Sequence, residues 1–168
     1  MKPSPTILIT GAAGNVGSLL ARHLVPKEHN LRLMYHRKAL PPDLASSPNV
    51  VPVQADLAKP ETLSLAVADA DVIVHFAGIL FAARPERFLP VTNTRWFSNL
   101  VDAALNAHVG RVILISFPHV EGPTTSDQPA TGRLDREPIS VHAKTRLEEE
   151  RLLFEKTQGS KTIPVVLR

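Results

Sequence analysis

Three glycines near the N-terminus have the spacing of a loop that binds phosphate groups. Gly11, Gly14 and Gly17 follow an apolar run at 6–10 and precede a segment at 18–25 whose apolar residues recur at helical spacing. The first glycine allows a sharp turn off a strand, the second lets a pyrophosphate approach bare backbone, and the third lets a helix lie close to the sheet. The start of the helix then offers unpaired N–H groups to the phosphates. The pattern favours a dinucleotide site over an ordinary strand–turn–helix.

The order Gly-x-x-Gly-x-x-Gly after Thr10 resembles the short-chain dehydrogenase/reductase superfamily. It is most similar to the extended and atypical branch, which holds the NAD(P)-dependent epimerases and dehydratases, and the likeness covers nearly the whole chain. The resemblance implies an NAD(P)-binding domain. The implied cofactor contacts in the first loop are Gly11, Ala13, Gly14, Asn15, Val16 and Gly17.

The end of the second predicted strand bears on the choice between NAD and NADP. In NAD-specific folds an acidic residue about 20 positions beyond the glycines holds the ribose 2′-hydroxyl. This chain has His36, Arg37 and Lys38 at that place, and no acidic residue follows until Asp43. A guanidinium binds a 2′-phosphate that a carboxylate would repel. We therefore favour NADP(H) over NAD(H), with Arg37 as the main contact and His36 beside it. The alternative is that these are solvated charges at a strand end.

The resemblance implies further cofactor contacts after the third and fourth predicted strands. Asp56 and Leu57 match the adenine-binding position, where the carboxylate accepts from the base amino group and the Leu57 N–H meets a ring nitrogen. Asp56 could equally cap the helix predicted at 59–68. The residues that match the segment passing under the cofactor are Phe76, Ala77 and Gly78. His75 has no visible partner in its apolar strand, and we expect it to pack beside the sheet.

Active relatives in this superfamily carry a Ser or Thr at the end of the fifth strand and Tyr-x-x-x-Lys on the next helix. The Tyr is the acid/base and the Lys holds the nicotinamide ribose, and four residues of helix put both on one face. Lys144 fits the Lys, with Glu148 four residues later, so the Tyr position is Ser140. The serine position falls on Phe117, because Ser116 is one place early and points to the other side of the strand.

Other groups must therefore carry any proton transfer, and a tyrosine-based mechanism is disfavoured. A serine hydroxyl is too weak an acid without a neighbouring base. A histidine has a suitable pKa, but His142 lies about 200° around the helix from Lys144. His119, in the loop after the fifth strand, is freer and is the best reserve donor, and Asn93 matches an active-site Asn of the family. The candidate catalytic residues are Lys144, Asn93, Ser116, Ser140 and His119.

The elements that must position these residues alternate between strand and helix, which is typical of a parallel α/β protein. Strands are predicted at 6–10, 31–36, 49–53, 71–78, 111–116 and 162–168. We expect one NAD(P)-binding domain over 1–168, a Rossmann-type three-layer α/β/α fold with strand order 3-2-1-4-5-6. A helix at 93–104 carries Trp96 and Phe97, which serve either the core or a dimer interface. Residues 79–90 are predicted to be an irregular connection.

Composition excludes several classes of partner. The chain has 168 residues, a formal net charge of +3 and no cysteine. Its basic residues are scattered, so we expect no nucleic-acid partner, and no apolar run is long enough to cross a membrane. The N-terminus lacks a signal-peptide core, and the absence of cysteine suits a cytoplasmic protein. No metal site is predicted. We expect a dinucleotide as partner and consider a homodimer through the helices near 93–107 and 140–157.

Two functions stay open. Relatives continue after the sixth strand into a smaller substrate-binding region, which we expect to be absent because this sequence stops at Arg168, either as a fragment of a longer protein or as a natural cofactor domain. The first function is the NAD(P)(H)-binding domain of an epimerase/dehydratase-like oxidoreductase for a small carbonyl or sugar-nucleotide substrate, with the usual Tyr and Ser replaced. The second is a non-catalytic NADP(H)-sensing or protein-interaction domain. The cofactor loop supports both, and the lost Tyr and Ser favour the second.

Overall fold

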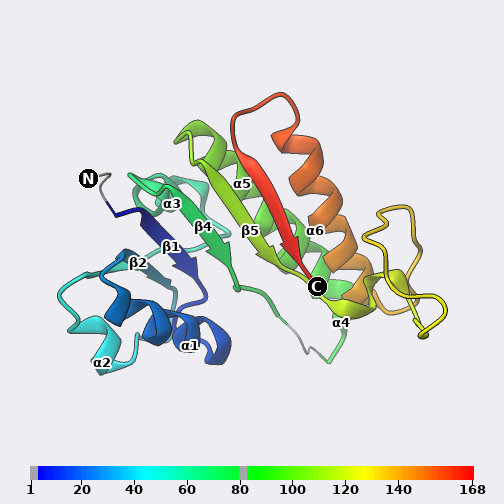
Figure 1. Cartoon of the computed structure of the whole chain (residues 1–168), viewed down its shortest axis with the longest axis horizontal. Helices are drawn as coiled ribbons and strands as arrows, with labels where there is room; N and C mark the ends of the chain where they lie inside the picture. Colours follow the sequence, from blue (N-terminus) through cyan, green and yellow to red (C-terminus); the bar gives the residue numbers. More distant parts are fainter. Residues whose placement is uncertain (1–3, 80–82) are drawn as a thin grey trace.

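Six parallel strands form one sheet. The computed structural model describes residues 4–79 and 83–168. The strands are β1 (Thr6–Thr10), β2 (Asn30–Tyr35), β3 (Val50–Gln54), β4 (Val72–His75), β5 (Arg111–Ile115) and β6 (Ile163–Leu167). Their order is β3-β2-β1-β4-β5-β6 and all neighbouring pairs are parallel (Figure 1). This confirms the predicted Rossmann-type α/β fold and its strand order.

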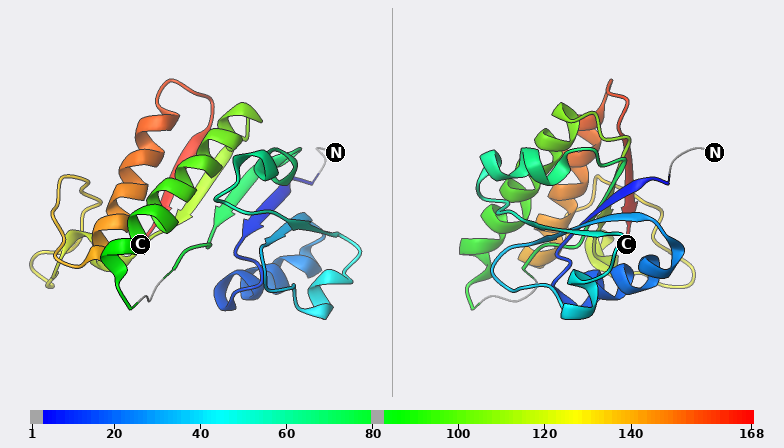
Figure 2. Two further views of the ribbon diagram at one scale, coloured as in Figure 1. Left: turned by 180° about the vertical axis from the view of Figure 1, so that it is seen from behind. Right: turned by 90° about the vertical axis from the view of Figure 1, so that its left-hand side faces the viewer.

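Helices cover the sheet on both faces. They are α1 (Asn15–Leu24), α2 (Pro42–Ala45), α3 (Pro60–Val67), α4 (Pro85–Leu89), α5 (Trp96–Asn106) and α6 (Val141–Thr157). Short 3-10 turns, η1 and η3, lie at Val25–Lys27 and Pro118–Glu121, and a π-helical turn, η2, lies at Pro90–Arg95. Helices α3, α5 and α6 pack on one face, and α1 and α2 lie on the other, over the β1–β3 half (Figures 1 and 2).

Successive strand residues point into two separate cores. In β1, Leu8 packs with α3 and α5, whereas Ile9 packs with α1 and α2, and neither is exposed. The same alternation separates Leu33 from Met34 in β2. Strands that are covered on both faces need apolar residues at nearly every position, which is why their sequences read as continuous apolar runs. The two cores hold the sheet from both sides. Because all six strands are parallel, their carboxyl ends meet at one edge of the sheet.

Several local boundaries differ from prediction: β4 ends at His75 rather than at residue 78, and α5 begins at Trp96 rather than at residue 93. Helix α1 begins at Asn15 rather than at residue 18. The prediction of an irregular 79–90 segment is wrong for 85–90, where α4 and the start of η2 lie, and the short α2 was not predicted. Both short helices have proline in their first turn, where its missing N–H costs little. Predictions for residues 1–3 and 80–82 lie outside the described residues.

Candidate functional site

A side chain does not fit at Gly11, in the loop between β1 and α1, or at Gly17, in the first turn of α1. Gly11 has a φ of +68°, and a Cβ there would lie 2.9 Å from the Ala77 nitrogen. A Cβ on Gly17 would lie 2.5 Å from the Gly11 carbonyl oxygen. Gly14 donates its N–H to that same oxygen at 2.9 Å. The glycines therefore let both the first turn of α1 and the end of β4 approach the loop.

No side chain of the cap residue or acidic residue of the first turn occupies the N-terminus of α1, so an anion can bind there. Gly14 is its N-cap, without a capping side chain, and the first turn holds no acidic residue. The first helical bond runs from the Ser18 N–H to the Gly14 carbonyl at 3.0 Å. The N–H groups of Asn15, Val16 and Gly17 consequently have no acceptor within the helix. Uncapped N–H groups at the positive end of a helix fit the phosphates of a dinucleotide.

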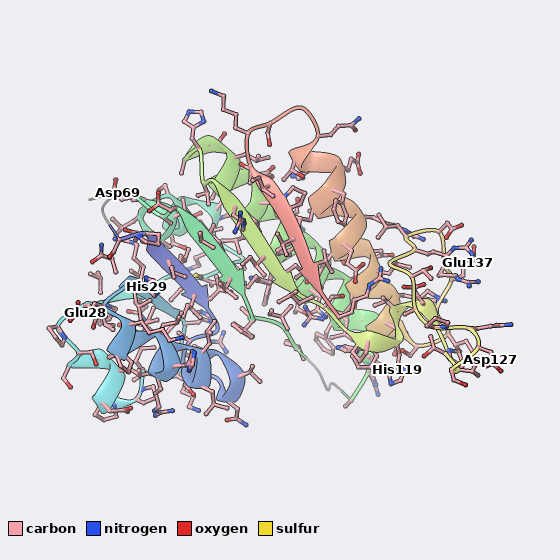
Figure 3. The ribbon with its side chains drawn as sticks, in the orientation of Figure 1. Glu28, His29, Asp69, His119, Asp127 and Glu137 are labelled. Carbon is pink, nitrogen blue, oxygen red and sulfur yellow. The ribbon has the colours of Figure 1, made fainter. Side chains whose placement is uncertain are left out.

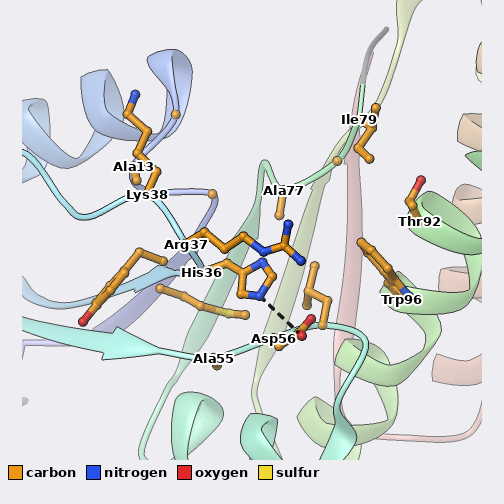
Figure 4. A pocket seen from close by; sticks show the side chains of 16 residues that line it. Ala13, His36, Arg37, Lys38, Ala55, Asp56, Ala77, Ile79, Thr92 and Trp96 are labelled. Atoms are coloured by element: carbon orange, nitrogen blue, oxygen red, sulfur yellow. Dashed lines mark ion pairs between the residues drawn. The ribbon is translucent and has the colours of Figure 1, made fainter. Parts of the chain in front are cut away.

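An open cavity of about 270 Å³ extends from this loop across the ends of β2, β1 and β4 (Figure 4). Nine of the predicted cofactor residues line it: Gly11, Ala13, Gly14, His36, Arg37, Asp56, Leu57, Ala77 and Gly78. Sequence reasoning missed other lining residues, namely Met34, Tyr35, Ala55, Ile79, Thr92 and Trp96, and noted Lys38 only as part of the basic cluster. Residues predicted as contacts that are not in the lining are Asn15, Val16, Gly17, Phe76 and Lys144.

Basic and acidic side chains meet at the β2 end of the cavity. The His36 Nε2 lies 3.4 Å from the Asp56 Oδ2, as the dashed line in Figure 4 marks. The other Asp56 oxygen accepts the Ala58 N–H at 2.9 Å, and the N-cap of α3 is Lys59, so Asp56 does not cap that helix. Arg37 extends into the cavity beside His36 and forms no ion pair with any described residue (Figure 4). Its guanidinium is therefore free to pair with an added phosphate.

His75 has a structural environment, as predicted. Its Nδ1 lies 2.8 Å from the Thr10 hydroxyl, which also accepts the Ala77 N–H at 3.3 Å. The ring packs against Phe97 with centroids 4.7 Å apart. Burial, together with the positive charge of Arg146, lowers the pKa of His75 to about 3. The imidazole is therefore neutral near pH 7, and it ties the end of β1 to the end of β4.

Asn93 holds one wall of the cavity. It is buried in the π-helical turn η2, a type of turn that often occurs at functional sites. Its Oδ1 accepts the Ile79 N–H at 3.2 Å, and its Nδ2 lies 3.4 Å from both the Ile79 carbonyl and the Thr145 hydroxyl. Asn93 thus links the segment after β4 to α6. Of the five candidate catalytic residues, it is the one that directly supports the cavity.

Three other candidates are turned away from the cavity. The Ser140 hydroxyl caps α6 by accepting the Ala143 N–H at 3.1 Å. The Ser116 hydroxyl donates to Glu150. Lys144 is exposed and borders a second depression, next to Glu148 and Arg151. The structure therefore does not bring these three side chains to the cavity.

The inner face of α6 is the one opposite Lys144. Ala143 and Arg146 are buried on that face. His142 packs edge-on against Phe117 with ring centroids 4.6 Å apart, and its Nε2 is buried with no partner among the described residues. Burial and then the charge of Arg146 lower the pKa of His142. His142 and Lys144 lie on different sides of α6, as predicted, but the prediction that Lys144 faces the site is wrong: Lys144 is exposed and His142 faces inward.

His119 is the remaining candidate. It lies in the η3 turn after β5, exposed at the surface (Figure 3). Its ring meets Phe117 edge-on with centroids 5.2 Å apart. Phe117 therefore contacts two imidazoles at the carboxyl end of β5, next to the end of β4.

Comparisons with known proteins agree with this geometry. The family model described as NAD(P)H-binding matches residues 11–157. The chain is 34% identical over 143 residues to the low-salt glycan biosynthesis protein Agl12 of Haloferax volcanii, which covers 76% of this chain and 46% of that protein. It is 30% identical over 140 residues to uronate dehydrogenase of Pseudomonas syringae pv. tomato, covering 83% and 50%. The chain spans about half the length of these curated relatives.

Solved structures show the same fold. A uronate dehydrogenase from Agrobacterium tumefaciens in complex with NAD superposes with a TM-score of 0.80 at 26% identity, covering 95% of this chain and 59% of that one. A short-chain dehydrogenase/reductase superfamily protein from the same organism, with bound NAD, gives a TM-score of 0.77 at 25% identity, covering 97% and 48%. The glycine loop, the sheet order and these matches together show that the chain belongs to the NAD(P)H-binding family and, within it, to the epimerase/dehydratase-like part of the short-chain dehydrogenase/reductase superfamily.

Proposed function

We propose that this chain is the cofactor-binding half of an NADP(H)-dependent oxidoreductase or epimerase that acts on a uronate, a sugar nucleotide or a similar small carbonyl compound. The observation that carries the proposal is the uncapped N-terminus of α1 facing a cavity floored by glycine. When bound, the dinucleotide would supply hydride transfer at its nicotinamide ring. The relatives named above, among them uronate dehydrogenases, support the substrate class.

Residues at the ends of three strands would each bind a different part of the dinucleotide. The free N–H groups at the start of α1, after β1, would bind the pyrophosphate. Asp56 and Leu57, after β3, would hold the adenine. Arg37, with His36 beside it, would bind the 2′-phosphate of NADP, because its guanidinium has no acidic partner among the described residues.

Titration with NADPH and NADH tests this assignment. Trp96 is the single tryptophan of the chain and lines the cavity, so its fluorescence reports binding. Charged hydrogen bonds contribute about 1.5–3 kcal/mol, so we expect NADPH to bind roughly 10- to 100-fold more tightly than NADH. Arg37→Ala should abolish most of that preference. The control Arg111→Ala removes an exposed cation from the amino end of β5, at the opposite end of the strands from the cavity, and should leave the preference intact. An unchanged preference in Arg37→Ala would refute the 2′-phosphate assignment.

His119 is the acid/base group that we propose for an active form: it would accept the substrate hydroxyl proton when NADP⁺ takes the hydride, and donate a proton in the reverse direction. It is exposed at the carboxyl edge of the sheet, whereas the Ser116 and Ser140 hydroxyls are engaged in hydrogen bonds. A turnover screen with glucuronate and UDP-glucose in the presence of NADP⁺ should then show activity that His119→Ala removes. Turnover that survives in His119→Ala would show that another group moves the proton.

The alternative function is a non-catalytic NADP(H)-sensing or interaction domain. It is favoured by the engagement of both serine hydroxyls in structural bonds. NADPH binding without turnover on any tested carbonyl substrate, in the full-length protein, would support this alternative.

We also propose a cytoplasmic homodimer that uses the helices near 93–107 and 140–157. Phe154 on α6 is 40% exposed, so its ring can pack against the partner subunit on this surface. Phe97 is fully buried and Trp96 lines the cavity, so neither belongs to that contact surface. None of the described helices combines the length and apolar character that a membrane crossing requires. Sedimentation should give twice the monomer mass for the native chain and the monomer mass for Phe154→Glu.

A further inference from the structure

The loop at 122–140, which the structure describes in full, joins η3 to α6 without a helix or strand of its own. It extends beyond α6 at the carboxyl edge of the sheet and is yellow in Figure 1. Loops of this length are usually either functional or disordered. Pro138 is the one buried residue of the loop, so its own side chains do little to fix its conformation. Charged side chains from outside the loop fix it instead.

Glu121 and Arg168 hold the middle of the loop through its backbone. The Glu121 carboxylate accepts the Thr131 N–H at 3.2 Å and the Gly132 N–H at 2.8 Å. Arg168 forms an ion pair with Glu121 and donates from Nη2 to the Arg133 carbonyl oxygen at 3.1 Å. The Glu121 side chain is 3% exposed. Because a buried charge is costly without its partner, this pair holds 131–133 in one place.

Two residues of α6 complete the arrangement. Glu150 accepts the Arg168 Nε–H with both carboxylate oxygens at 3.1 Å, so the guanidinium is bound on two sides. Arg151 donates from Nε to the Leu134 carbonyl oxygen at 2.7 Å and from Nη2 to the Arg136 carbonyl oxygen at 3.0 Å. These contacts replace the backbone bonds that a helix or strand would make. We call the four side chains the clasp: Glu121, Glu150, Arg151 and Arg168.

The two ends of the clasped loop border an open cavity of about 480 Å³. Its apolar lining residues are Pro123, Pro138, Ile139 and Ala143. Ile139 is 92% exposed, so nearly all of its apolar surface is available to a ligand. No lysine, arginine, aspartate or glutamate is among the described lining residues. A cavity of this size with apolar walls and few polar groups is typical of a small-molecule site.

His119 is one of the few polar residues of this lining. Its ring lies edge-on against Phe117, as described above, and it is the acid/base group that we propose for an active form. His119 follows β5, which pairs with β4, and the cofactor cavity ends at Gly78 after β4. The two cavities therefore lie at neighbouring strand ends, as a cofactor and its substrate require.

We propose that this cavity is a subsite for an apolar group of the substrate, a ring or alkyl chain next to the reacting carbon, and that the clasp positions its wall. This inference rests on the proposed function for the identity of the ligand as substrate. The clasp residues are positioning residues, because they bind the loop backbone and none of them lines the cavity.

Binding of trans-2-decalone, an apolar bicyclic ketone, tests the cavity. A titration followed by amide NMR should shift the Ile139 and Ala143 signals, and the shifts give the affinity. Ile139→Asp places a charge in the apolar wall and should weaken binding roughly tenfold or more. The control Leu65→Asp makes the same kind of change at an exposed leucine of α3 and should leave the affinity within about twofold.

Variants of Arg168 test the clasp. In Arg168→Met the Thr131 and Gly132 amides should exchange with solvent about tenfold faster or more, because Glu121 loses the cation that fixes it. Affinity for the ketone should fall roughly fivefold, whereas NADPH affinity should stay within about twofold, because Arg168 does not line the cofactor cavity. Arg168→Lys keeps a cation beside Glu121 and Glu150 and should recover part of both losses.

Two further variants guard against a folding defect. Arg151→Met removes an exposed side chain and its two bonds to the loop, so it should weaken ketone binding without unpairing a buried carboxylate. Arg133→Met breaks an exposed pair with Asp135 and should change neither amide exchange nor ketone affinity. Circular dichroism confirms that each variant is folded.

The outcomes separate this inference from the proposed function. A native protein that binds NADPH but not the ketone, shifts away from Ile139 and Ala143, or equal losses in Ile139→Asp and Leu65→Asp would each overturn the subsite. Native amide exchange and ketone affinity in both Arg168→Met and Arg151→Met would overturn the role of the clasp. A native protein that binds the ketone but not NADPH would overturn the proposed function, and the identity of the ligand as substrate would fall with it. Selective loss of ketone affinity in the cavity and clasp variants supports the inference.

Discussion

A single methyl group at Gly17 should damage both the fold and the cofactor site. The Cβ of Gly17→Ala would lie 2.5 Å from the Gly11 carbonyl oxygen, 2.9 Å from the Gly11 carbonyl carbon and 3.1 Å from the Ala12 Cα. All three atoms belong to the backbone, so no side chain can rotate to relieve the contact. Helix α1 must move away from the loop, and its N–H groups must move with it.

The magnitude follows from two opposing effects. Overpacking of a tight contact costs about 1–3 kcal/mol. Alanine regains up to about 1 kcal/mol because it has a higher helix propensity than glycine. The free energy of unfolding should therefore fall by about 1–2 kcal/mol, which lowers the melting temperature of a chain of this length by roughly 2–8 °C. Because the helix N-terminus is displaced, NADPH affinity should fall by about tenfold or more.

The assay is urea unfolding followed by circular dichroism, combined with NADPH titration of Trp96 fluorescence. Leu19→Ala is the control, because Leu19 lies on the same helix and is 63% exposed. It should change the unfolding free energy by less than about 0.5 kcal/mol. A Gly17→Ala protein with native stability and native NADPH affinity would refute the close-approach reasoning, and with it the role of the loop.

Three further outcomes are expected from urea unfolding. Ser140→Ala removes the cap of α6 and should lower the unfolding free energy by about 1 kcal/mol without changing NADPH affinity; a loss of affinity would show that the hydroxyl reaches the cavity. Burial raises the pKa of Glu149 from 4.5 to about 7, so its contribution to stability is present below pH 4.5 and is lost as pH rises toward 7. Glu149→Gln should remove that slope between pH 4.5 and 7, and an unaltered slope would contradict the assignment. Burial lowers the pKa of His75 from 6.5 to about 3, so its contribution is present above pH 6.5 and is lost as pH falls toward 3. The unfolding free energy of His75→Gln should therefore fall less than that of the native chain between pH 6.5 and 3. Parallel plots of unfolding free energy against pH for the two proteins would argue against a buried neutral imidazole.

The fold and the phosphate-binding loop could be predicted because their signals are local. Each strand is a short apolar run, and right-handed crossovers leave few ways to order such strands in a sheet. The glycine spacing at 11, 14 and 17 reports backbone contacts that depend on a few neighbouring residues. The basic cluster at the end of β2 was likewise found from its distance along the chain.

The orientation of α6 could not be predicted, because it depends on tertiary pairing. Charged residues are usually exposed, yet Arg146 and Glu149 are buried as a pair while Lys144 faces solvent. The lysine spacing therefore predicted that the face of α6 carrying Lys144 points to the cavity, whereas that face is exposed. Trp96 was missed for a related reason, since it follows the π-helical turn at Pro90–Arg95, and the regular helical period does not hold across that turn.

The π-helical turn at Pro90–Arg95 holds one residue more than a regular helical turn. The function of this segment should therefore depend more on its number of residues than on their types. Each residue of an α-helix advances by about 100°, so deleting one residue between Asn93 and Trp96 would rotate everything before the cut by that amount relative to α5. The amide that anchors Ile79 and the indole beside it could then no longer face the same space. Conservative replacements should be tolerated there far better than an insertion or deletion of one codon.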